Sequence, residues 1–108
     1  MRIQHRTVFG VANGATHVAL TVPAGRKYEI LELAFWGNSG GGGVNVAELV
    51  SDGTTTVLPS APTYPAGLFA DTLPHSSLCL EAGDTYSVAC NNTTGGITCW
   101  LTYMDVGP

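Results

Sequence analysis

Charged side chains are scarce in this sequence. Only 11% of its 108 residues are Asp, Glu, Lys or Arg, against roughly 25% in ordinary soluble domains. A small monomer with so few charges leaves much uncharged surface in water, which favours burial of part of that surface against partners. A surface rich in Thr, Ser and Asn is the alternative that stays open.

Basic residues are absent after position 27. The four that occur are Arg2, Arg6, Arg26 and Lys27. All eight acids follow them, so the segment 1–27 carries +4 and the segment 28–108 carries −8. Nucleic-acid binding needs clustered Lys and Arg, so we expect no nucleic-acid partner. We expect the basic N-terminal arm to dock on an acidic neighbour instead, which includes another copy of the chain.

Long apolar runs and helical periodicity are also missing. No run is long enough to span a bilayer, so no membrane partner is expected. The charged start at residues 1–6 is not followed by the apolar segment of a secretory signal, which predicts synthesis in a cytosol. No stretch of useful length has the 3.6-residue apolar period of an amphipathic helix.

Metal-binding motifs are lacking too. The candidate ligands are Cys79, Cys90, Cys99, His5, His17 and His75, and none has CxxC or HxxxH spacing. The odd number of cysteines predicts reduced, mostly buried thiols. A cross-strand Cys90–Cys99 disulfide stays open as an alternative, because a turn centred between Thr94 and Gly95 would set the two residues opposite each other.

Two pairs of acids and one glycine-rich segment complete the candidates for chemistry. Glu29 and Glu32 lie three apart on an expected strand and so face opposite sides, and Glu81 and Asp84 lie in an expected turn. The segment 37–43 is followed by a strand and not by a phosphate-binding helix, so we expect a mobile loop. We therefore predict no enzyme activity, no cofactor, and no catalytic, cofactor-binding or metal-binding residue.

Short β-prone runs, separated by turn residues, fill the chain. A strand at 17–22 is followed by a corner at 23–25 and by the longest run, 27–36. Leu31, Leu33 and Phe35 are expected on one face of this run, and Tyr28, Ile30, Ala34 and Trp36 on the other. Both faces are apolar, so the run is expected to be a central strand covered on both sides.

The remaining segments complete a predicted sandwich. Strands are expected at 44–50 and 54–58 around a hairpin turn at 51–53, and a second hairpin is expected to join 85–90 to 97–104. The proline-rich span 59–77 is expected to be a long crossing loop with one short strand at 67–71. Greek-key and jelly-roll topologies require such a return.

We therefore predict an all-β fold, an antiparallel β-sandwich that is jelly-roll or Greek-key-like, with about seven to eight strands and no significant helix. Residues 1–9 are expected to form an N-terminal arm, either extended or adding an edge strand. Residues 10–108 are expected to form the single β-sandwich domain.

Five aromatic side chains are candidates for a sugar-stacking platform: Trp36, Tyr64, Phe69, Trp100 and Tyr103. Packing in a core or between subunits is the commoner role of aromatic residues in a small β domain.

Three stretches carry a resemblance to a known class of proteins. They are Thr-His-Val-Ala-Leu-Thr-Val-Pro-Ala-Gly-Arg-Lys-Tyr-Glu at 16–29, Leu-Glu-Ala-Gly-Asp-Thr-Tyr-Ser-Val at 80–88, and Gly-Gly-Ile-Thr-Cys-Trp-Leu-Thr-Tyr-Met-Asp-Val at 95–106. Together they resemble small β-sandwich structural proteins of tailed bacteriophages. The middle of the chain departs from that pattern.

The resemblance implies a non-enzymatic virion structural protein, made in the host cytoplasm. It implies most simply a capsid decoration (cement) protein that binds and stabilises the shell. The implied partners are copies of itself, most simply a trimer, and the major capsid protein or other virion proteins. A small head–tail or tail component, and a carbohydrate- or receptor-binding β-sandwich module, are the alternatives.

Overall fold

The computed structural model describes residues 2–40, 44–58 and 63–108. Its eight strands are β1 (Ile3–Val11), β2 (Thr16–Thr21), β3 (Lys27–Ser39), β4 (Asn45–Ser51), β5 (Thr55–Val57), β6 (Gly67–Leu80), β7 (Thr85–Asn91) and β8 (Thr93–Gly107). Within these described ranges there is no helix that could cross a membrane.

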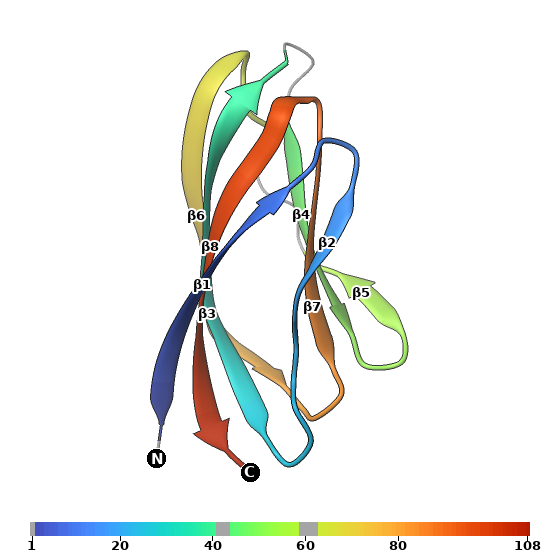
Figure 1. The fold of residues 1–108 in the computed structure, drawn as a ribbon, viewed down its shortest axis with the longest axis vertical. Helices are drawn as coiled ribbons and strands as arrows, with labels where there is room; N and C mark the ends of the chain where they lie inside the picture. Colours follow the sequence, from blue (N-terminus) through green and yellow to red (C-terminus); the bar gives the residue numbers. More distant parts are fainter. Residues whose placement is uncertain (1, 41–43, 59–62) are drawn as a thin grey trace.

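The strands form two four-stranded antiparallel sheets. The long sheet has the strand order β1-β8-β3-β6 and the short sheet has the order β2-β7-β4-β5. Figure 1 shows the sheets close to edge-on, the long sheet on the left and the short sheet on the right, with both chain ends at the bottom of the long sheet. The predicted all-β fold, an antiparallel β-sandwich with about seven to eight strands, is confirmed.

Consecutive strands mostly alternate between the sheets. The β4–β5 hairpin, predicted from the turn at 51–53, is the one connection between described strands that stays within a sheet. The predicted hairpin of 85–90 with 97–104 is wrong, because β7 and β8 lie in opposite sheets. Between them Asn92 adopts a left-handed backbone conformation (φ 59°) that turns the chain across the sandwich. The alternative of a Cys90–Cys99 disulfide depended on that hairpin and is therefore also wrong. Both thiols are free and buried.

Strand β3 is interior, paired with β8 on one side and with β6 on the other, as predicted. The assignment of its faces is wrong, because a bulge between Ile30 and Glu32 shifts the alternation. Ile30, Leu33 and Phe35 consequently all lie in the core. The expected cover on both sides is also wrong, since Trp36 on the outer face is 49% exposed.

Strand β6 replaces most of the predicted crossing loop. It covers 14 residues, and that loop prediction is wrong because β6 is an edge strand and so tolerates Pro74. Residues 75–77 form a bulge in the pairing of β6 with β3. Leu78 is paired with Ile30 and Pro74 with Glu32, so the register moves four residues along β6 but only two along β3. Residues 59–62 of the predicted loop lie outside the described residues.

The glycine-rich segment is also less of a loop than expected. Strand β3 continues through Gly37 to Ser39. A Cβ on Gly37 would lie 3.0 Å from the Gly96 carbonyl oxygen and 3.0 Å from Ile97 Cγ2, so close packing requires glycine there. Residues 41–43 lie outside the described residues.

Strand β1 takes the edge-strand alternative left open for the N-terminal arm. All 9 of its residues are in register with β8. Residues 2–6 are exposed, and Arg2 Nη2 lies 2.8 Å from Glu29 Oε1 on β3. Part of the arm's positive charge is therefore neutralised within the chain.

Candidate functional site: the outer face of the long sheet

The outer face of the long sheet exposes large apolar side chains. Val8, Trp36, Leu68 and Trp100 are 59%, 49%, 85% and 42% exposed. They lie on the four strands of that sheet, each next to an inward-facing core residue in the strand alternation. We call these four, with Ala34 and Ala70 between them, the outer apolar face.

Strand register determines where large and small side chains lie on the outer apolar face. Trp100 on β8 is paired with Val8 on β1 and with Ala34 on β3. In the next row, Thr98 on β8 is paired with Gly10 and with Trp36. Neighbouring strands are about 4.8 Å apart, so Trp100 lies between Val8 and Ala34, and Trp36 lies between Thr98 and Ala70.

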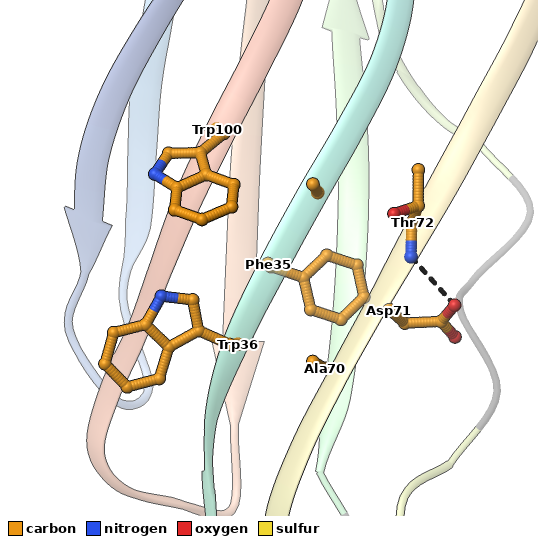
Figure 2. Close-up of a pocket in the computed structure, with 7 residues that line it drawn as sticks. Phe35, Trp36, Ala70, Asp71, Thr72 and Trp100 are labelled. Atoms are coloured by element: carbon orange, nitrogen blue, oxygen red, sulfur yellow. Dashed lines mark hydrogen bonds between the residues drawn. The ribbon is translucent and has the colours of Figure 1, made fainter.

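A hollow of about 450 Å³ lies between the two indoles and β6. Its lining residues are Ala34, Phe35, Trp36, Ala70, Asp71, Thr72 and Trp100. Figure 2 shows both indoles at one side of the hollow and Ala70 and Thr72 on the strand opposite. A second hollow, of about 380 Å³, lies where Trp36 meets Leu68.

The one carboxylate of the larger hollow is already engaged. Tyr64 donates its hydroxyl to Asp71 Oδ2 (2.6 Å), and the backbone N–H of Thr72 donates to Oδ1 (2.8 Å). The Tyr64 hydrogen bond, more than any other interaction, holds the pKa of Asp71 below its usual range. The hollow therefore offers mainly indole and methyl surface to a partner.

The five candidate aromatics do not form one platform. Trp36 and Trp100 line the same hollow. Tyr64 and Phe69 instead stack on each other at 4.9 Å, packed against the core. Tyr103 stacks on Tyr28 and His5 at centroid distances of 5.0 and 5.3 Å. The register of β3 against β8, which sequence does not reveal, decides this division.

A buried polar cluster connects the two sheets. Glu48 of β4 is an inward-facing acid whose side chain is only 2% exposed. Its Oε2 accepts a hydrogen bond from the Tyr86 hydroxyl on β7 and lies 2.8 Å from His75 Nε2 on β6. Burial, reinforced by the Glu48 charge and hydrogen bond, raises the pKa of Tyr86 far above its ordinary value.

Sequence reasoning missed this cluster and placed His75 in a loop. The signal that could have found it is the alternation Val44, Val46, Glu48, Val50, which puts an acid in an apolar phase.

The other histidines and the cysteines are scattered. His17 stacks on Phe9 at 5.0 Å. Within the ranges that the structure describes, no three His, Cys, Asp or Glu side chains gather in a way that could hold a metal ion. Cys90 and Cys99 are buried as predicted, but Cys79 is exposed, so its predicted burial is wrong. Strand β6 is an edge strand, and the alternation along it sends Cys79 to solvent while Leu80 enters the core.

Three of the four acids in the two candidate pairs have partners within the fold. Glu29 and Glu81 form ion pairs with Arg2 and Lys27, at 2.8 and 3.4 Å. Asp84 Oδ2 accepts the backbone N–H of Glu81 at 2.9 Å and closes the turn between β6 and β7. These carboxylates therefore have structural partners.

Comparison with known proteins shows a likeness of fold. No protein-family model matches the sequence, and no curated protein matches it. A chain of the Bacillus endospore appendages, which form a family of disulfide-linked pili, is 14% identical with a TM-score of 0.52. The match covers 99% of this chain and 89% of that one. At this identity the likeness establishes a shared β fold and nothing about activity.

Two viral structures match less well. A pentameric capsid protein isolated from metagenomic phage sequences is 19% identical with a TM-score of 0.47, over 94% of this chain and 60% of that one. A chain of infectious bursal disease virus, Gx strain, is 12% identical with a TM-score of 0.47, over 97% of this chain and 33% of that one. Similarity this low supports no functional conclusion.

Proposed function

We propose that this chain is a non-enzymatic structural protein of a virus particle, and more specifically a capsid decoration (cement) protein of a tailed phage. The observation that carries the proposal is the outer apolar face. Contiguous exposed apolar patches on a small soluble domain mark interaction sites. Half-exposed tryptophans such as Trp36 and Trp100 are the side chains that most often anchor protein interfaces.

Fold and sequence support the same proposal. The strand orders 1-8-3-6 and 2-7-4-5 are those of an eight-stranded jelly roll, an architecture that viral capsid domains and lectins use. That is an analogy of fold, which by itself does not establish function. The stretches that resemble phage structural proteins supply the second line of support.

The proposed partners follow from the same reasoning. The chain assembles with copies of itself, with the trimer expected from sequence as the simplest ring, and binds the major capsid protein or another virion protein. It is made in the host cytoplasm and resides in the virion. A head–tail or tail location would use the same surface.

A carbohydrate-binding module is the second candidate. The hollow beside Trp36 and Trp100 favours it, because flat aromatic faces stack on the apolar faces of sugars, and Thr72 lines the opposite side of the hollow. Glycan binding that quenches tryptophan fluorescence, and that Trp100→Ala abolishes, would favour this candidate over the structural one.

The direct test uses particles purified from the source of the chain. Mass spectrometry is expected to find the chain at a fixed copy number relative to the shell protein. Particles stripped of the chain are expected to lose heat resistance and to regain it when the wild type is added, but not when the Trp36→Ser/Trp100→Ser variant is added. Val57→Ser is the matched control, because Val57 is 58% exposed on the short sheet. Absence of the chain from intact particles would overturn the proposal.

A further inference from the structure

We propose that a second copy of this chain covers the part of the outer apolar face that lies on β1, β8 and β3, through a two-fold axis that runs along β8. The inference rests on the proposed function in one respect, which is that this face is an assembly surface. It goes further by naming the occupant and the residues that meet. Three features of the face support it: the order of its strands, the pattern of its large and small side chains, and the charges at its edge.

The geometry follows from strand order. Strands β1 and β3 flank β8, and both run antiparallel to it. A rotation of 180° about an axis parallel to β8, between two facing sheets, therefore sets β1 of one copy over β3 of the other. Each row of side chains then faces the same row of the partner. Packed sheets lie about 10 Å apart, which leaves room for one interdigitated layer of side chains.

The pattern of large and small side chains on the face fits this arrangement. Val8 of one copy lies over Ala34 of the other and enters the hollow of about 450 Å³ between Trp36 and Trp100. Trp36 lies over Gly10 of the other copy, where no side chain stands. The two Trp100 side chains meet at the axis. Away from the axis the side chains are matched large to small, Val8 with Ala34 and Trp36 with Gly10, as a self-complementary two-fold contact requires.

The charges at the edge of the face fit it as well. The row next to Val8 and Trp100 runs from Arg6 through Thr102 to Glu32. Three of the four basic residues form ion pairs within the chain, whereas Arg6 and Glu32 form none with any described residue. The two-fold rotation places Arg6 of each copy over Glu32 of the other. A face with one cation and one anion related in this way is complementary to itself, which favours a second copy over an unrelated acidic or basic partner.

Sedimentation equilibrium of the full chain tests the contact. The wild type is expected at an even multiple of 11.2 kDa. Val8→Asp places a carboxylate in the hollow and is expected to weaken association at least about tenfold, since apolar contacts at the centre of an interface dominate its affinity. Val57→Asp, at an equally exposed valine of the short sheet, is the control and is expected to change nothing.

Further variants keep the test from depending on Val8→Asp alone. Gly10→Val has room in the single chain, since its Cβ would meet only the Ile97 carbonyl oxygen at 3.8 Å, yet it blocks the partner's Trp36. Arg6→Glu and Glu32→Arg are each expected to weaken association about two- to tenfold, as exposed ion pairs do. The double variant is expected to restore association, a rescue that only an Arg6–Glu32 contact between copies predicts.

The outcomes separate this contact from the proposed function. A chain that sediments only at 11.2 kDa, or only as a trimer, overturns the two-fold contact, because a two-fold axis requires an even number of copies, and leaves the particle experiment to judge the virion role. A dimer or hexamer that Gly10→Val breaks supports the contact even if the chain is absent from particles. Failure of the charge-swapped double variant to regain association would also overturn the assigned geometry.

Discussion

The buried carboxylate of Glu48 gives the sharpest prediction about stability. Its Oε2 contacts Tyr86 from the short sheet and His75 from the long sheet, so one atom connects the two layers. Tyr86 is completely buried and Glu48 nearly so, which removes water as an alternative partner. A buried polar group that loses its partner costs its desolvation free energy in addition to the lost bond.

Single substitutions in this cluster are therefore expected to be costly. Tyr86→Phe removes a hydrogen bond to a buried charged group, which is worth about 1.5–3 kcal/mol of unfolding free energy. Glu48→Leu leaves the Tyr86 hydroxyl buried without an acceptor and is expected to cost about 1–3 kcal/mol. His75 is partly exposed, so His75→Gln is expected to cost less than either.

The double variant Glu48→Leu/Tyr86→Phe is the critical measurement. Replacing both partners by apolar groups of similar shape leaves neither position with a buried unsatisfied group, and His75, which loses the Glu48 carboxylate, is 20% exposed to water. The cost of the double variant is therefore expected to be well below the sum of the single costs. Urea unfolding with an unchanged m-value measures all three free energies, and the cycle isolates the coupling. Additive costs, or single costs below about 0.5 kcal/mol, would show that the Glu48–Tyr86 hydrogen bond does not stabilise the fold.

Three further predictions follow from burial and close contact. Deleting residues 2–6 is expected to leave a folded sandwich with near-native circular dichroism, because these residues are exposed, and an unfolded product would contradict this. Cys79 alone is expected to react with a thiol reagent in the native state, since burial raises the pKa of the Cys99 thiol to about 12 and so removes its thiolate at neutral pH. Gly37→Ala is expected to lower the unfolding free energy by about 1–3 kcal/mol through overpacking, while Gly10→Ala, which has room for its Cβ, serves as the control in the same urea titration.

Alternation and turn chemistry were enough to predict the strand content and the β4–β5 hairpin. They were not enough to assign strands to sheets. The inward residues of β7 and β8 have the same alternating pattern whether the two strands pair side by side or face each other across the core. The difference depends on the single residue Asn92 between them, whose left-handed conformation no apolar pattern signals.

Two other features depend on tertiary context. Pro74 indicates a break in a strand, but β6 is an edge strand, and an edge strand tolerates proline because the N–H groups on its free side need no partner in the sheet. The bulge after Ile30 changes which residues of β3 face the core, and it thereby places Trp36 on the side that faces solvent. The candidate site could therefore be predicted as a set of aromatic residues, but not as a surface.

The stretches that resemble phage structural proteins are better explained by their contacts within the fold than by contact with a partner. The corner after β2 and the turn before β7 are hydrogen-bonded to each other: Val22 N–H donates to the Asp84 carbonyl, and Gly83 N–H donates to the Val22 carbonyl, each at 2.9 Å. These bonds extend the β2–β7 ladder of the short sheet into the two connections that lead to and from the long sheet.

The scarcity of charge is best understood at the outer apolar face. Arg2, Arg26 and Lys27 are used in ion pairs within the chain, so a basic arm has little charge left for an acidic neighbour. What remains exposed on the long sheet is mainly indole and aliphatic surface. Exposed ion pairs contribute about 0–1 kcal/mol each, whereas a fully buried large apolar side chain contributes about 1.5–3 kcal/mol. Assembly of this chain is therefore expected to be driven by burial of this face, with the few remaining charges setting the orientation of the partner.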